Sequence, residues 1–210
     1  MAEPSDNTLS ECDPTPEDET WALAIEQLDC FQGLADDEDI ERLFASQNNM
    51  PVKIMPTLYL GDGDCAETWE RLEQVGIRRI LNMAGVMEVS ETAVKHYKRL
   101  GITYKVIEAE DMEDYPLLGN HWEEAHAFLQ QGREEKTLVH CSGGWNRSVL
   151  ILAAKCLIRQ QQDKIQTDVM EIVKHIRQCR GNGALHNGGF QRQLVAFARQ
   201  HDLLGPKPET

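Results

Sequence analysis

HCSGGWNRS, at residues 140–148, joins a short apolar segment to a longer one. The segment before it, Thr137-Leu138-Val139-His140, has the composition of a buried strand, and the segment that follows, 149–154, that of a buried helix. A strand, a glycine-rich loop and a helix in this order point backbone N–H groups into one concavity at the positive end of the helix dipole. The stretch therefore predicts an anion-binding loop (residues 141–147) at a strand–helix junction.

The side chains of this loop predict phosphoryl transfer. Gly143 and Gly144 let the backbone curl round an anion without Cβ clashes. Cys141 is expected at the floor of the concavity, where the N–H groups and the dipole lower the pKa of its thiol and favour a thiolate. Arg147 can clamp two phosphate oxygens with its planar guanidinium. We therefore expect Cys141 to be a nucleophile and Arg147 to stabilise charge.

The rest of the chain from residue 52 alternates between strand and helix patterns. Strands are expected within 52–60, 78–83, 103–107 and 137–140, and helices over 65–75, 88–100, 118–131, 147–161, 165–179 and 188–203. This alternation predicts an α/β fold with a central, mainly parallel sheet of four to five strands and helices on both faces.

The first 50 residues have a different character. They hold 14 acidic side chains and one basic one, Arg42, a sum of −13 within a net charge of −14 for the chain. Thr15-Pro16 forms a helix-start signal, and Trp21, Ile25, Leu28 and Phe31 recur at helical spacing, which predicts an amphipathic helix over about 16–31. A second short helix is expected around Ile40, Leu43 and Phe44.

We therefore divide the chain into an acidic, partly disordered extension over 1–50 and a catalytic domain over 51–205. The acidity of the extension favours a basic protein partner and disfavours nucleic acid and membranes, and a solvated tail is the alternative interpretation. The six cysteines form no zinc-binding pattern, no signal or lipidation motif is visible, and no run of 18 apolar residues occurs. A cytoplasmic or nuclear protein without metal or cofactor is expected.

The motif His-Cys-x5-Arg-Ser resembles the signature of the protein tyrosine phosphatase superfamily, and the chain is similar to its dual-specificity branch. Leu58-Tyr59-Leu60-Gly61, Ile80-Leu81-Asn82 and the stretch from Asn187 to Leu194 resemble further motifs of this branch. The resemblance covers roughly residues 52–203. It implies a dual-specificity protein phosphatase that hydrolyses phosphotyrosine and phosphoserine or phosphothreonine in proteins through a phosphocysteine intermediate.

The resemblance also implies roles for individual residues. The loop Ser142, Gly143, Gly144, Trp145, Asn146 and Arg147 would bind the phosphate. Ser148 would help the thiolate to leave, His140 would hold the loop and tune the thiol, and Asn187 would brace the loop from behind. A general acid is expected about thirty residues before the nucleophile, where Asp111 is the best match and Asp114 and Glu110 are rivals.

Two loop residues depart from the branch pattern. Gly143 replaces a common alanine, and the bulky Trp145 is expected at the rim of the pocket or packed against a neighbouring loop. Two alternative functions remain open. One is a phosphatase of a non-protein substrate (an RNA 5′-triphosphate, a lipid or a glucan), and the other is a non-catalytic module that binds phosphoproteins.

Overall fold

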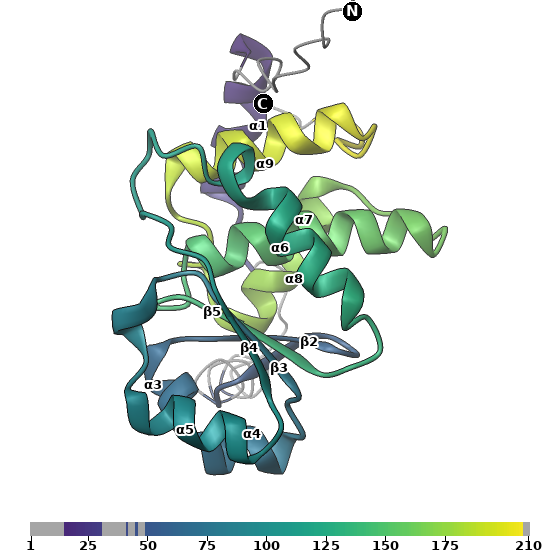
Figure 1. The fold of residues 1–210 in the computed structure, drawn as a ribbon. Helices are drawn as coiled ribbons and strands as arrows, with labels where there is room; N and C mark the ends of the chain where they lie inside the picture. Colours follow the sequence, from purple (N-terminus) through teal and green to yellow (C-terminus); the bar gives the residue numbers. More distant parts are fainter. Residues whose placement is uncertain (1–14, 31–40, 42–44, 46–48, 208–210) are drawn as a thin grey trace, which may run out of the picture.

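The computed structural model describes residues 15–30, 41, 45 and 49–207 and has a five-stranded sheet at its centre (Figure 1). The strand order is β1-β2-β5-β3-β4. The hairpin strand β1 is antiparallel to β2, and the other neighbours are parallel. The strands are β1 (Val52–Met55), β2 (Leu58–Gly61), β3 (Arg79–Asn82), β4 (Thr103–Val106) and β5 (Thr137–His140). The predicted α/β fold with a mainly parallel sheet is confirmed.

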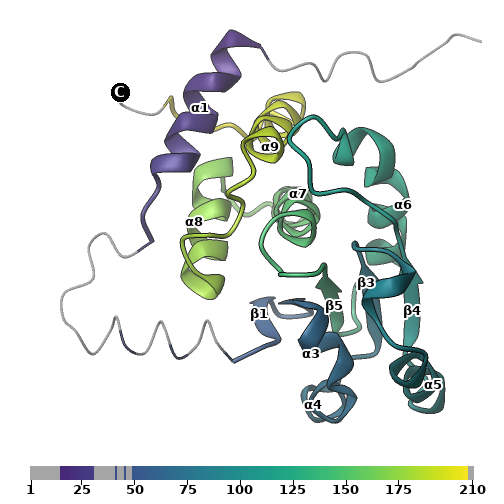
Figure 2. The same ribbon diagram turned by 90° about the vertical axis from the view of Figure 1, so that its left-hand side faces the viewer.

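Helices cover both faces of the sheet, as predicted (Figure 2). One face carries α3 (Gly63–Glu67), α4 (Trp69–Val75) and α5 (Glu91–Arg99), with the short 3-10 helix η1 (Val86–Glu88) before α5. The other face carries α6 (Leu117–Gln131), α7 (Arg147–Gln162), α8 (Val169–Arg180) and α9 (Gly188–Gln200), with α1 (Pro16–Gln27) outside α8 and α9. Among the described residues, no helix combines the length and apolar character that crossing a membrane requires.

The central strands divide the apolar core into two layers by simple alternation. In β5, Val139 contributes to the core cluster under α6–α9, and Leu138 contributes to the cluster over α3–α5. Leu81 and Ile80 of β3 repeat this division. Successive side chains of a strand point to opposite faces, so two consecutive apolar residues in the middle of a strand fit a sheet covered on both sides.

Several predicted elements differ in detail. The strand expected within 52–60 is a hairpin of β1 and β2, because Pro56 lacks an N–H and disfavours a regular continuation of the strand. The helix expected over 65–75 is two helices, α3 and α4, which meet at Thr68. The strand predicted at 137–140 matches β5 residue for residue.

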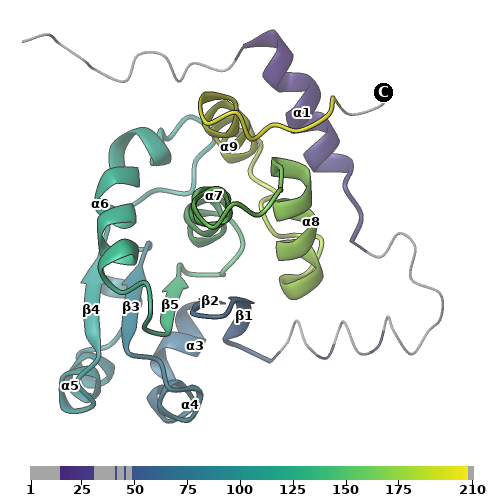
Figure 3. The same cartoon turned by 90° about the vertical axis from the view of Figure 1, so that its right-hand side faces the viewer.

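The helix of the acidic extension packs into the main core (Figure 3). Trp21 and Ile25 are buried there, against α9. The Thr15 hydroxyl and the Asp18 carboxylate form the reciprocal capping box at its start, and Asp18 pairs with Arg199 of α9 at 2.9 Å. The helix α1 is therefore part of the folded body. The predicted domain boundary at residue 51 stays a prediction.

The end of α1 corrects the prediction of a helix over 16–31. The helix ends at Gln27, and Leu28 is already extended. The guanidinium of Arg177, on α8, donates to the carbonyl oxygens of Ile25 (2.6 Å) and Leu28 (2.5 Å). The Ile25 carbonyl also accepts from the Leu28 backbone N–H at 3.2 Å, so Arg177 adds to the hydrogen bonds that cap the end of the helix and ties it to α8. The second helix expected around Ile40, Leu43 and Phe44 lies outside the described residues.

Candidate active site

The anion-binding loop follows β5, the central strand of the sheet, and leads into α7, which begins at Arg147. Both neighbours of β5 are parallel to it, so the carboxyl ends of three strands meet at this loop. Ligands bind at this edge in open parallel sheets. The expected strand–loop–helix arrangement is present, with Cys141 buried directly after the strand.

The backbone of the loop turns its carbonyl groups outward. Four consecutive carbonyl oxygens accept hydrogen bonds from outside the loop: Ser142 from the Gly63 amide (2.9 Å), Gly143 and Gly144 from the Arg180 guanidinium (3.1 and 3.4 Å), and Trp145 from the Leu185 amide (2.7 Å). In a trans peptide the N–H and the C=O point in opposite directions. The following N–H groups therefore point to the inner side of the loop, where they can bind an anion.

Gly144 is required by the backbone. Its φ is +66°, and a Cβ at this position would lie 2.6 Å from the carbonyl oxygen of Gly61. Any larger residue would be strained and would also meet the β2 end of the sheet. This close approach of two backbone segments fixes the loop against β2.

The two departures from the branch pattern are related to each other. A Cβ on Gly143 would lie 2.8 Å from Cδ1 of Trp145, so the indole occupies the space that an alanine would need. One face of the Trp145 ring stacks on the Arg180 guanidinium, 3.6 Å from the ring centroid, and a Cβ on Gly183 would lie 3.3 Å from the same ring. The side chain lines the pocket and also packs against the loop after α8.

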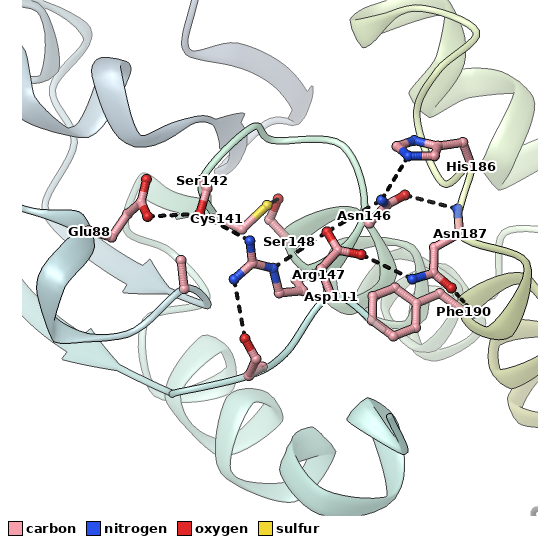
Figure 4. A network of polar contacts seen from close by, with 12 residues as sticks. Glu88, Asp111, Cys141, Ser142, Asn146, Arg147, Ser148, His186, Asn187 and Phe190 are labelled. Atoms are coloured by element: carbon pink, nitrogen blue, oxygen red, sulfur yellow. Dashed lines mark hydrogen bonds and ion pairs between the residues drawn. The ribbon is translucent and has the colours of Figure 1, made fainter. Parts of the chain in front are cut away.

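The candidate nucleophile has a hydroxyl donor beside it (Figure 4). The Ser148 hydroxyl donates to the Cys141 sulfur at 3.2 Å, and both residues are buried. The structure brings together these two residues that the sequence predicts to act together. A hydrogen bond of this kind favours the thiolate as a leaving group.

Arg147 reaches across the loop. Its Nη1 donates to the Ala109 carbonyl at 3.2 Å and its Nη2 to the Ser142 hydroxyl at 3.0 Å. Its buried Nε has no hydrogen-bond partner among the described residues and lies 3.6 Å from the Asp111 carboxylate. The guanidinium is therefore held between the Ala109 carbonyl, the Ser142 hydroxyl and the Asp111 carboxylate.

The positions of the three candidate general acids distinguish them. Asp111 lines a pocket of about 420 Å³ together with Cys141, whereas Asp114 and Glu110 do not line it. Asp111 accepts hydrogen bonds from the side-chain amides of Asn187 (3.0 Å) and Asn146 (3.3 Å). The geometry therefore favours Asp111 among the three candidates.

His140 is buried, and neither of its ring nitrogens has a hydrogen-bond partner among the described residues. Burial lowers the pKa of His140 to about 4, so the imidazole is neutral near pH 7. Its expected roles in holding the loop and tuning the thiol stay predictions. Asn187 caps the start of α9, and its backbone N–H donates to Asn146 at 3.1 Å, so it does contact the loop, as expected.

Three residues whose side chains contact the loop were not identified from the sequence. Glu88, in η1, accepts a hydrogen bond from the Ser142 hydroxyl at 2.7 Å. His186 contacts the Asn146 amide at 3.2 Å, and Arg180 holds the loop carbonyls as described above. His186 directly precedes Asn187, a signal that could have drawn attention to it, whereas no spacing links Glu88 or Arg180 to the loop. Among the described residues, no three His, Cys, Asp or Glu side chains gather as a metal site.

Comparisons with known proteins agree with this geometry. The family model for the dual specificity phosphatase catalytic domain matches residues 58–200. Human dual specificity protein phosphatase 26 is 30% identical over 173 residues, which cover 77% of this chain and 75% of that protein.

Two solved structures share the fold. Human DUSP28 aligns with a TM-score of 0.59 at 21% identity and covers 72% of this chain and 94% of its own. The human tyrosine phosphatase-like serine/threonine/tyrosine-interacting protein aligns with a TM-score of 0.54 at 18% identity, over 71% of this chain and 96% of its own.

Proposed function

This chain belongs to the dual specificity phosphatase family, and from that membership we propose that it hydrolyses phosphotyrosine and phosphoserine or phosphothreonine in proteins through a phosphocysteine intermediate. Family membership supports phosphatase activity in general. The observation that carries the finer proposal is that Cys141 and Asp111 line one pocket, with Ser148 bonded to the sulfur and Arg147 beside the carboxylate.

In the first step, the Cys141 thiolate attacks phosphorus, and the P–O bond to the leaving group breaks. The loop N–H groups and Arg147 hold the phosphoryl oxygens, where charge develops. For this the Arg147 guanidinium exchanges its present hydrogen bond to Ser142 for one to the phosphate. Asp111 gives its proton to the departing oxygen, which leaves as an alcohol or phenol.

In the second step, water attacks phosphorus, and the P–S bond breaks. Asp111, now ionised, takes the proton of the water. The sulfur leaves as a thiolate, and the Ser148 hydroxyl stabilises the charge on it. The products are inorganic phosphate and the resting enzyme, so atoms and charge balance without a further reactant.

A protein substrate is favoured over a polyphosphorylated one by the charges near the pocket. Glu113, which pairs with Arg192 at 3.4 Å, lines the pocket, and Glu88 lies against the loop. These carboxylates repel groups that carry several phosphates, such as an RNA 5′-triphosphate. The proposed basic protein partner of the extension and the cytoplasmic or nuclear location stay predictions from the sequence.

The proposal is tested with p-nitrophenyl phosphate and with phosphopeptides. The wild-type protein is expected to turn over p-nitrophenyl phosphate, phosphotyrosine and phosphothreonine peptides, and Cys141→Ser to turn over none of them. Binding of phosphopeptides without turnover would instead indicate a phosphoprotein-binding module. Faster turnover of an RNA 5′-triphosphate, a phosphoinositide or a phosphoglucan than of any peptide would overturn the substrate class.

A further inference from the structure

Two side-chain amides donate hydrogen bonds to the Asp111 carboxyl group. Asn187 Nδ2 donates to Oδ1 at 3.0 Å, and Asn146 Nδ2 donates to Oδ2 at 3.3 Å (Figure 4). Asp111 lies in a segment with high exposure at residues 110–114. The segment is also held by the bond from Arg147 to the Ala109 carbonyl and by the pairing of Arg192 with Glu113 at 3.4 Å. Among the described residues, the two amides are the groups that donate hydrogen bonds to the Asp111 carboxyl group itself.

The orientation of both amides is determined by backbone donors. A side-chain amide has an acceptor oxygen at one end and two N–H donors at the other. The Asn146 oxygen accepts from the Asn187 backbone N–H at 3.1 Å, and the Asn187 oxygen accepts from the Phe190 backbone N–H at 3.2 Å. Since a backbone N–H can only donate, each oxygen faces its backbone partner, and both NH₂ groups must face Asp111.

The second N–H of Asn146 is used by His186. The Nδ1 of His186 lies 2.9 Å from the Gly183 carbonyl oxygen, so Nδ1 carries the hydrogen. Nε2, which lies 3.2 Å from Asn146 Nδ2, is then the acceptor of the neutral ring. Asn146 therefore makes three directed hydrogen bonds, one as acceptor and two as donor. A serine has one hydrogen to donate and an aspartate has none, so only a carboxamide fits all three.

We propose that Asn146 is a positioning residue for the general acid. His186 and the Asn187 backbone orient the Asn146 side chain, which holds Asp111 in the pocket that Cys141 also lines. This inference rests on the proposed function, because it concerns the acid of that reaction. Each carboxyl oxygen has a second lone pair that the amides do not use. Arg147 Nε lies 3.6 Å from Oδ2, so the second lone pair of Oδ1 is the better place for the proton.

The test compares Asn146→Ala, Asp111→Ala and the double variant on two leaving groups. p-Nitrophenol leaves with little need for protonation, whereas phenol needs the proton. Asn146→Ala is expected to lower kcat for phenyl phosphate roughly 10-fold more than for p-nitrophenyl phosphate, which corresponds to the loss of one hydrogen bond. In the Asp111→Ala background the same change is expected to add no leaving-group dependence.

Three companion variants and one control sharpen the result. Asn146→Asp keeps the shape and the acceptor but replaces the donors with a carboxylate that repels Asp111, so it is expected to be worse than Asn146→Ala on phenyl phosphate. His186→Gln, which can still accept from Asn146, is expected to retain more activity on phenyl phosphate than His186→Ala. Asn120→Ala, exposed on α6, serves as the matched control.

A readout without catalysis separates this inference from the proposed function. Amide hydrogen exchange over residues 108–114 is expected to be faster in Asn146→Ala than in the wild type and in Asn120→Ala. Unchanged exchange in this segment, or equal rate losses on both leaving groups, would overturn the positioning role. A wild-type protein that lacks turnover would overturn the proposed function, and the exchange experiment would still decide whether Asn146 positions this segment.

Discussion

The Ser148 hydroxyl donates to the Cys141 sulfur across 3.2 Å, and α7 supplies the hydroxyl from its first turn. The donor therefore belongs to a rigid helix, while the sulfur belongs to the loop directly after β5. Both groups are buried, so the hydroxyl is fixed beside the sulfur in the free protein.

Replacing Ser148 is expected to slow the second step more than the first. Ser148→Ala removes the donor that stabilises the leaving thiolate, and a hydrogen bond to a charged group corresponds to roughly 10- to 100-fold in rate. Rapid-quench experiments with p-nitrophenyl phosphate are expected to show a burst of about one p-nitrophenol per enzyme, followed by slow turnover. A steady-state rate equal to that of the wild type would contradict the assignment.

The pairing of Gly143 with Trp145 predicts a compensating double variant. Gly143→Ala places a methyl group 2.8 Å from the indole, and overpacking of this kind costs about 1–3 kcal/mol. Trp145→Ile is expected to make room, so the double variant should have a higher kcat/KM than Gly143→Ala alone. Purely additive losses in kcat/KM would show that the two residues do not constrain each other.

The burial of one face of α1 predicts a large loss of stability when a side chain on that face is shortened to alanine. Trp21 is 3% exposed and Leu23, on the same helix, is 52% exposed. Trp21→Ala is expected to cost about 3–5 kcal/mol, which lowers the Tm by roughly 6–20 °C at this chain length. Leu23→Ala is the matched control and is expected to change stability by less than about 0.5 kcal/mol. Similar Tm values for the two variants would show that α1 is not part of the core.

Lys155 predicts a pH-dependent gain in stability. The residue is 2% exposed, its Nζ donates to Gln130 Oε1 at 2.8 Å, and burial lowers its pKa from 10.5 to about 8. Between these values the unfolded state binds more protons than the folded state, so the stability of the wild type rises with pH in this window, and the full cost of the buried charge remains below pH 8.

Lys155→Met removes this cost. The variant is expected to be more stable than the wild type at pH 7, by up to about 3 kcal/mol, and the advantage should shrink as the pH approaches 10. Urea unfolding of both proteins at pH 7 and pH 10 measures the difference. Lys95→Met, at an exposed site, is expected to give no such change with pH. A destabilised Lys155→Met at pH 7 would mean that the bond to Gln130 outweighs the burial of the charge.

The sequence predicts best where local pattern and final structure coincide. The strand β5 and the start of α7 follow from an apolar run, two glycines and a second apolar run, all within about twenty residues. The end of α1 could not be found in this way. It depends on Arg177, which is distant along the chain and donates to backbone carbonyl groups. Every residue has such a carbonyl group, so the local sequence does not show which ones Arg177 reaches.

The same distinction holds for the candidate site. Cys141, Arg147 and Ser148 are neighbours along the chain, so one motif identifies them. Which of three acidic residues lines the pocket depends on how the segment after β4 lies, and this became visible only in the fold. Glu88 reaches Ser142 because β3 and β5 are parallel neighbours, a relationship that neither segment encodes alone.

The position of β5 between two parallel neighbours limits how this protein can change. Both edges of the strand are hydrogen-bonded, from Thr137 to His140, so it cannot slide without breaking pairs with β2 and β3. Removing or adding one residue within it would turn every later side chain to the opposite face, and the sulfur would enter the core instead of the pocket. Insertions and deletions within β5 are therefore expected to abolish activity, whereas those in the connections between helices are expected to be tolerated.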